Sequence, residues 1–453
     1  MQALRRHGGI AWLLLTIVLA VACVADRAAG GQEPVSEPRE RLPPHPLSLS
    51  LRGAVEAAGQ NNPTVLLAKE RIEAAKGDVV TQLGAMLPNL SSTVRQTRQT
   101  QFLGTFGLSP VRSHPFNIFD ARVTASQNLF SLSLIQRWRA SRETLHGTEF
   151  DAESSRFDTM ASAALAYMDG LKAMAALTMR QANIQLIEEV LNTTKTRQKG
   201  GAATGLETAR LEGQLANERQ QVVVARSDLA RAKNTLANYL GLPFEVQLSL
   251  TDQLKPDVPA VQDFQADWDG AVANRPEVQA QSKRVRSAEL TYASITGERV
   301  PSLVAQGDSG LIGNRASNTL DTYNMALLLQ IPIFDGGQRE GRISSARSQL
   351  RQEALRMRVV LNQIRTEVTD ARIVLESASE QAAIAQLGLQ AAIKETALAR
   401  ERYAVLTAAS QFDVTNAINS IARARENLIS ALYELNAARV NFARATGSLN
   451  TLN

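Results

Sequence analysis

Cysteine is nearly absent from this chain of 453 residues, and a single copy, Cys23, excludes both an intrachain disulfide and a zinc site built from paired cysteines. The four histidines are scattered, and no two of them stand at a metal-ligand spacing. No group of residues suggests a nucleophile or an acid–base pair. The sequence therefore predicts no catalytic residue, no metal and no cofactor, and it argues against an enzyme.

Aromatic residues are also scarce, at 5% of the chain, whereas alanine is abundant. Small apolar side chains suit helices that pack closely along their whole length. Lys and Arg exceed Asp and Glu by only 49 to 44. Without a basic stripe or a reading motif, this balance indicates no nucleic-acid partner.

Long apolar runs are missing beyond the N-terminus. A basic start and an apolar run over residues 10–22 predict a signal peptide at 1–30, since a membrane span takes roughly 20 apolar residues. The residues before Cys23 match a lipoprotein box only in part, because Leu19 stands one position too far from the cysteine. The sequence thus leaves two mature starts open, a lipidated Cys23 or a cleavage further on. A proline-rich linker is predicted at 31–47.

After this linker the chain contains two similar copies. Asn62-Pro63 is matched by Arg275-Pro276, and Leu240-Gly241 is matched by Thr446-Gly447. The ordered prolines and glycines argue against chance similarity between alanine-rich helices, so we predict a tandem duplication. The predicted segments are a first repeat at 48–241 with a β-hairpin at about 88–130, an inter-repeat linker at 242–265, a second repeat at 266–447 with a β-hairpin at about 301–334, and a C-terminal tail at 448–453.

Each copy contains a predicted helix, two strands, a very long helix and a further helix. The long helix of the second copy is predicted from Gln338 to Val405, with apolar residues at two positions of every heptad. Such a pattern is typical of helices that pack as coiled coils. At 1.5 Å per residue the helix is on the order of 100 Å long, too long for a globular domain.

The predicted strands alternate apolar and polar residues, as in Phe119–Leu129 and Tyr323–Ile331. Strands of about 9–11 residues can cross a bilayer in a barrel. Four strands cannot close a barrel, and lipid tolerates no open sheet edge, so a membrane location requires an oligomer. The predicted fold is mostly α with membrane β and has a duplicated helix–strand–strand–helix–helix repeat. A trimer would give a 12-stranded β-barrel, wide enough to leave a lumen and continued by a long α-helical barrel. A soluble sheet that caps a coiled coil is the alternative.

Five short motifs follow one another along the two halves. They are Asn61-Asn62-Pro63, Leu87-Pro88-Asn89-Leu90, Leu240-Gly241-Leu242-Pro243, Ile333-Phe334-Asp335-Gly336-Gly337, and Arg402-Tyr403 followed by Phe412-Asp413-Val414. In this order they resemble the TolC-like outer-membrane efflux proteins over essentially the whole chain after the linker. The resemblance implies a homotrimer in the lipid of the outer membrane with a helical tunnel in the periplasm. It also implies docking to a periplasmic adaptor protein and to an inner-membrane pump, proton-driven or ATP-driven, for the export of small molecules or proteins.

The resemblance also suggests gate residues at the periplasmic end. Asp413 falls where the family carries an acidic ring, Asn416 replaces the family's second acid, and Glu207 is the first-copy counterpart of Asp413. With Tyr403 they are the candidate gate residues. The residues alone offer another role, because Asp413 could cap the helix that begins beside it.

The two turns between long helices are the candidate adaptor-docking tips. Gly200, Gly201 and Ala202 belong to the first turn, and Leu406 and Thr407 belong to the second, which lacks the family's glycine. A periplasmic coiled-coil adaptor or a scaffold protein without a pore is the alternative function. An adaptor has one helical hairpin rather than two copies with strands in each, and a scaffold explains neither the export signal nor the alternating strands.

Overall fold

The structure, a computed structural model, describes residues 47–102, 104, 107, 111–243, 246–257, 263–405 and 411–449. Cys23, the predicted signal peptide and nearly all of the first linker lie outside these residues, as do Leu406 and Thr407. Lipidation of Cys23 therefore stays a prediction.

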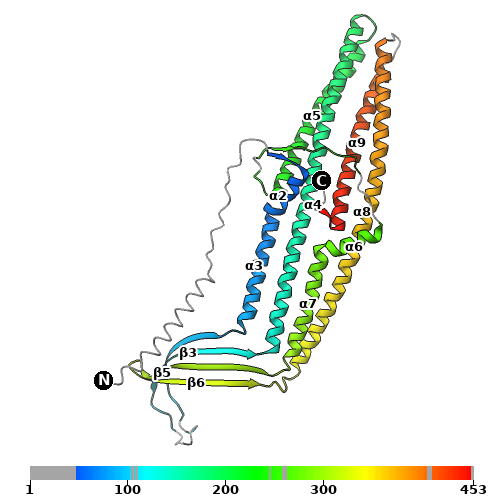
Figure 1. Ribbon diagram of the computed structural model, residues 1–453. Helices are drawn as coiled ribbons and strands as arrows, with labels where there is room; N and C mark the ends of the chain where they lie inside the picture. Colours follow the sequence, from blue (N-terminus) through cyan, green and yellow to red (C-terminus); the bar gives the residue numbers. More distant parts are fainter. Residues whose placement is uncertain are drawn as a thin grey trace. The chain divides into compact units, whose positions relative to one another are not determined.

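The described chain consists of two halves with the same order of elements (Figure 1). The first half contains α2 (Leu51–Asn61), α3 (Pro63–Gly84), β2 (Asn89–Gln99), β3 (Phe116–Phe130), α4 (Leu132–Lys199) and α5 (Gly205–Leu240). The second contains α6 (Phe264–Asn274), α7 (Pro276–Gly297), β5 (Ser302–Arg315), β6 (Asn318–Gln330), α8 (Gln338–Val405) and α9 (Gln411–Thr446). Corresponding helices have equal lengths of 11, 22, 68 and 36 residues. Equal lengths in the same order are what a duplication leaves.

The single helix predicted ahead of each hairpin is wrong, because the structure has two helices there. Pro63 and Pro276 each begin a new helix, and the preceding Asn62 and Arg275 have extended backbones with ψ of 132° and 124°. Proline cannot donate a helical hydrogen bond and disfavours a helical residue before it. The Asn62 side chain accepts a hydrogen bond from the Thr64 amide at 2.8 Å and so caps α3.

The predicted inter-repeat linker is more ordered than expected. β1 (Leu47–Leu49) and β4 (Leu248–Leu250) pair in parallel beside α4. The fully buried Tyr167 hydroxyl lies 2.9 Å from both the Leu49 carbonyl and the Asp252 carboxylate. Burial, together with Asp252, raises the pKa of Tyr167 to about 12. The short segments are thereby fixed to the middle of α4.

The long helices form two hairpins, α4 with α5 and α8 with α9, which run side by side in Figure 1. The predicted heptad seam of α8 is confirmed from Ile364 onward, where the residues at both heptad positions are buried or half-buried. Leu375 of this seam and Leu435 of α9 are completely buried and belong to the same apolar cluster. Among the described residues, no helix has both the length and the apolar character needed to cross a membrane.

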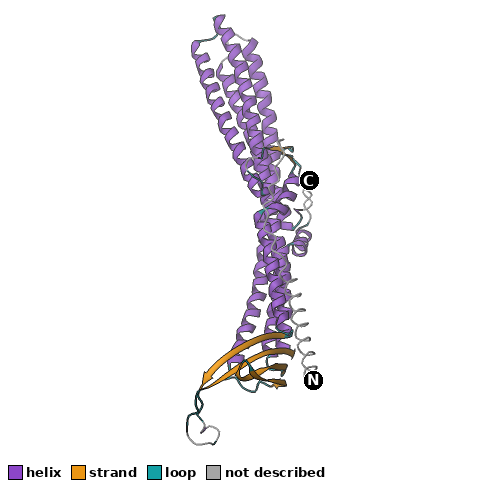
Figure 2. Ribbon diagram, turned by 90° about the vertical axis from the view of Figure 1, so that its left-hand side faces the viewer, coloured by secondary structure: helices purple, strands orange, loops and turns teal. Residues whose placement is uncertain are grey.

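The four long strands form one antiparallel sheet in the order β2-β3-β5-β6. One hairpin comes from each half, and the two meet along β3 and β5. Figure 2 shows this sheet curved and open, so β2 and β6 remain as free edges in the single chain. A closed barrel is therefore not formed by one copy.

Each half ends its last helix on a glycine that touches the proline break of that half. Gly241 (φ +67) follows α5, and a Cβ there would lie 2.6 Å from the Asn61 carbonyl oxygen. Gly447 (φ +75) follows α9, and a Cβ there would lie 2.9 Å from the Asn274 Cβ. Glycine is needed at both positions because of the left-handed backbone and the close approach.

Gly241→Ala is expected to destabilise the protein by roughly 2–3 kcal/mol, since it adds both backbone strain and a steric clash. Thermal melting in detergent, followed by circular dichroism, measures the change. Gly213→Ala is the matched control, because this glycine lies within α5 and a Cβ there would meet nothing within 4 Å. Equal melting of the two variants would show that the Gly241 contact carries no stability.

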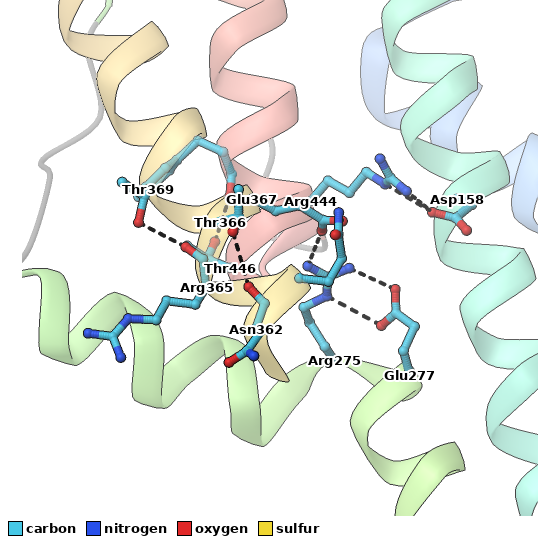
Figure 3. A network of polar contacts seen from close by, with 12 residues as sticks. Asp158, Arg275, Glu277, Asn362, Arg365, Thr366, Glu367, Thr369, Arg444 and Thr446 are labelled. Carbon is cyan, nitrogen blue, oxygen red and sulfur yellow. Dashed lines mark hydrogen bonds and ion pairs between the residues drawn. The ribbon is translucent and has the colours of Figure 1, made fainter. Parts of the chain in front are cut away.

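A polar network joins the two halves close to the second proline break (Figure 3). Arg275, which is 4% exposed, forms ion pairs with Glu277 on α7 and Glu367 on α8. Beside it Arg444 of α9 pairs with Asp158 of α4 at 2.7 Å. The network therefore ties α7, α8, α9 and α4 together at one level of the bundle.

Candidate functional site at the hairpin tips

The first hairpin turns at residues 200–204. Gly201 has a positive φ of 73°, and the Ala202 amide donates to the Arg197 carbonyl at 2.8 Å. Thr204 and Glu207 then form a capping box at the start of α5. Gly200, Gly201 and Ala202 are exposed, so this turn is presented to solvent. The second turn, with Leu406 and Thr407, lies outside the described residues.

Tyr403 lies near the end of α8 and is buried against the first hairpin, with 3% of its surface exposed. Its hydroxyl lies 3.1 Å from the Thr194 hydroxyl of α4. The surrounding apolar cluster draws on α4, α5 and α9 and consists of Ile187, Val190, Leu191, Leu211, Leu215, Val414 and Ile418. Tyr403 therefore joins the two hairpins near their tips.

Arg197 strengthens this junction from α4. Its guanidinium lies 4.4 Å from the centre of the Tyr403 ring and also donates a hydrogen bond to the Tyr403 carbonyl oxygen. A cation over an aromatic ring contributes about 0.5–2 kcal/mol. Arg400 of α8 pairs with Glu189 of α4 close by. We call the contacts of Arg197, Thr194 and Glu189 with Tyr403 and Arg400 the tip junction.

The other predicted gate residues have different surroundings. Asp413 and Asn416 lie in the first two turns of α9 and are exposed in the single chain. The Glu207 carboxylate instead accepts a hydrogen bond from the Thr204 amide at 3.2 Å, as part of the capping box. The Glu207 carbonyl accepts from the Gln411 side chain at 3.0 Å. The structure thus places Glu207 at a contact between the hairpins and gives its carboxylate a local structural role.

Sequence reasoning missed the partners of Tyr403 and Arg400. Arg197, Thr194 and Glu189 lie in α4 and belong to none of the short motifs. The only feature of the sequence that could have pointed to them is their position, because they precede the Gly200-Gly201 turn just as Tyr403 precedes the second turn. Only the packing of one hairpin on the other shows which of them meet.

An open membrane-strand sheet joined to two long helical hairpins defines the class of outer-membrane channel subunits, and comparisons with known proteins agree. The model of the outer membrane efflux protein family matches residues 54–242 and 269–448. The chain belongs to this family. Its members are outer-membrane channel proteins and not enzymes, which confirms both the predicted resemblance and the absence of an enzymatic activity. The predicted location in the outer membrane, with the helical tunnel in the periplasm, is confirmed as well.

Relatives of known role are similar over part of their length. The pyoverdine export outer membrane protein OpmQ of Pseudomonas aeruginosa is 25% identical over 317 residues, which are 67% of this chain and 65% of OpmQ. The outer membrane efflux protein BepC of Brucella suis is 23% identical over 69% of this chain and 67% of BepC. The chain thus spans slightly less than two thirds of OpmQ.

Solved structures share the fold. The CmeC outer membrane channel of Campylobacter jejuni superposes with a TM-score of 0.75 at 17% identity, covering 88% of this chain and 85% of CmeC. The outer membrane protein VceC of Vibrio cholerae gives a TM-score of 0.75 at 17% identity, covering 88% of this chain and 96% of VceC. None of these comparisons supports a periplasmic adaptor or a scaffold.

Proposed function

We propose that three copies of this chain close their sheets into one 12-stranded β-barrel, continued by a helical barrel, and that this channel exports small molecules or proteins across the outer membrane. The observation that carries the proposal is the open sheet with an apolar face. Tyr323, Met325 and Leu329 share that face of β6 and are 78%, 83% and 62% exposed in the single chain. In a closed barrel no strand edge is left unpaired, and lipid covers the apolar outer face.

The partners in this proposal are a periplasmic adaptor protein and an inner-membrane pump, as in a tripartite efflux or type I secretion system. Family membership supports both partners. The exposed Gly200-Gly201-Ala202 turn, with Leu406 and Thr407 of the second turn, is the proposed docking region for the adaptor. Asp413, Asn416 and Tyr403 are the proposed gate residues, with Glu207 beside them.

The mass of the detergent-purified protein, together with its conductance in planar bilayers, tests this function. We expect a particle of three chains that sediments with outer membranes and inserts as an ion-conducting channel. A monodisperse, water-soluble monomer would contradict the proposal. A detergent-dependent trimer without conductance would leave the assembly standing but contradict the pore.

Asp413 provides a test of the gate. Three copies facing one another in a narrow pore would attract cations, so Asp413→Ala should lower the cation-over-anion permeability ratio by about two- to fivefold. Reversal potentials in a KCl gradient measure this ratio. Asn416→Ala is the matched control, since Asn416 is exposed on the same helix but carries no charge. An Asp413→Ala channel with unchanged selectivity and a lower melting temperature would identify Asp413 as a helix-start residue instead.

A further inference from the structure

Away from the turn between β5 and β6, four charged side chains share one face of the sheet. Side chains at i and i+2 of a strand lie on the same face, and so do directly paired residues of neighbouring strands. Asp120 and Arg122 of β3 therefore share a face with Arg95 of β2, which pairs with Asp120. Asp308 of β5 pairs with Thr124 and joins the same face. The two hairpins thus contribute opposite charges to one place.

Three of these residues are in direct contact across the junction between the two halves. The Arg122 Nε lies 2.8 Å from an Asp120 carboxylate oxygen, and an Arg122 terminal nitrogen lies 2.9 Å from an Asp308 oxygen. The three side chains are 31%, 28% and 19% exposed. One guanidinium therefore bridges two carboxylates, and we call these three residues the strand triad.

The geometry of the strand triad depends on a glycine. Gly310 of β5 lies directly opposite Arg122, and a Cβ on Gly310 would approach the Arg122 Cβ to 2.4 Å. Because Gly310 has no side chain, that of Arg122 has room to reach along β5 to Asp308. A bulky residue at position 310 would displace either the arginine or the strand.

The opposite face of the sheet is apolar. Phe119, Val123, Tyr323, Met325 and Leu327 alternate with the polar set along β3 and β6. In a membrane barrel the apolar face contacts lipid, so the strand triad must face the lumen. This step rests on the proposed function, because it requires the sheet to close.

The strand triad also lies well inside the membrane. Asp308 is six residues and Arg122 eight residues from the ends of their strands that join the helices. At 3.3 Å per residue and a tilt of about 40°, these positions are about 15–20 Å from that end of a band roughly 25 Å tall.

We propose that the strand triad, with Arg95, sets the ion selectivity of the barrel section of the pore by keeping its charges balanced. Two arginines and two aspartates per chain cancel. Removal of Arg122 leaves one net negative charge per chain in the lumen, and removal of Asp308 leaves one net positive charge. At 0.01 M salt the Debye length is about 30 Å, so an unbalanced charge acts across the whole lumen. At 1 M salt, with a Debye length of about 3 Å, its influence is confined to the wall.

Reversal potentials of reconstituted trimers in KCl gradients test the proposal at about 0.01 M and about 1 M salt. We expect Arg122→Gln to raise the cation-over-anion permeability ratio about two- to fourfold at low salt and Asp308→Asn to lower it by a similar factor. The double variant Arg122→Gln/Asp308→Asn restores charge balance and should return the ratio to the wild-type value. The two single-variant shifts should both fade at high salt. Opposite signs at one place, with cancellation in the double variant, cannot come from a loss of folding.

Arg98→Gln is the matched control, because Arg98 pairs with Asn117 and lies on the apolar face. It removes the same charge and should leave the ratio unchanged. The proposal is overturned if Arg122→Gln and Asp308→Asn conduct with the wild-type ratio at low salt, or if Arg98→Gln shifts the ratio as much as Arg122→Gln. Should Arg122→Gln fail to assemble, Asp308→Asn, which keeps the pair of Arg122 with Asp120, decides alone. A wild-type protein that forms no channel at all contradicts the proposed function rather than the strand triad.

Discussion

Arg197→Ala is expected to raise the mean conductance of the reconstituted channel by an order of magnitude or more. Arg197 contacts the ring of Tyr403 and donates a hydrogen bond to the Tyr403 carbonyl oxygen. These two contacts join the end of α8 to α4. A hydrogen bond to a charged group contributes about 1.5–3 kcal/mol, and the contact with the ring adds about 1 kcal/mol. If opening of the tunnel separates the two hairpins at their tips, these contacts resist it.

The expected size follows from the number of subunits. In the proposed trimer, a loss of roughly 2 kcal/mol per chain becomes roughly 6 kcal/mol for three chains that open together, which shifts the equilibrium between closed and open states about 10⁴-fold. An open state that makes up about one in a thousand channels would then become the main state. Single-channel recordings in planar bilayers measure the change directly as open probability and conductance.

Arg219→Ala is the matched control for this prediction. Arg219 of α5 pairs with Glu188 of α4 at 2.8 Å, close to the tip junction, but it joins two helices of the same hairpin. Its loss should leave conductance unchanged. If Arg197→Ala channels conduct like the wild type, or if Arg219→Ala channels open equally, the tip junction does not hold the channel closed.

The long-range periodicities of the fold could be predicted from the sequence, because they are repeated many times. The seam of α8 recurs every seven residues, and the alternation along β3 and β6 recurs every two. Each pattern fixes one face of an element, and burial then follows that face. The proline breaks were misjudged for the opposite reason. Pro63 and Pro276 each interrupt a helical pattern that continues on both sides, and apolar periodicity alone does not register such a break.

The candidate site was predicted less completely than the fold. Tyr403 and Asp413 could be named because they belong to a motif, whereas Arg197 is 206 residues away from Tyr403 and meets it only through the packing of one hairpin on the other. Glu207 has a second role that its place in the repeat does not reveal. The Thr204-to-Glu207 spacing is that of a capping box, and the structure forms one. Its part in the gate stays a prediction.

The second large effect is expected at the network that joins the halves. Arg275→Met should destabilise the protein by roughly 3 kcal/mol, because it leaves the partly buried carboxylates of Glu277 and Glu367 without their shared cation. Thermal melting in detergent should fall by several degrees. Arg299→Met is the matched control, since Arg299 pairs with Glu340 at 2.7 Å but both side chains are more than half exposed. Its loss should change stability by less than about 1 kcal/mol.

The pH dependence of stability distinguishes two roles of Arg275, pairing with charged partners and packing. Burial alone would raise the pKa of Glu367, but hydrogen bonds from Gln363 and Arg275 outweigh it and hold that pKa below its usual value. A carboxyl whose pKa is lowered by folding stabilises the folded state above its unfolded pKa of about 4.3, and this contribution is lost as the pH falls through the folded pKa. The stability gap between wild type and Arg275→Met should therefore be full above about pH 5 and narrow below about pH 4. Glu367→Gln added to Arg275→Met should recover part of the loss at neutral pH, because it removes an unpaired carboxylate. A stability gap that stays constant from pH 3 to pH 7, with no recovery in the double variant, would mean that Arg275 stabilises the second half by packing alone.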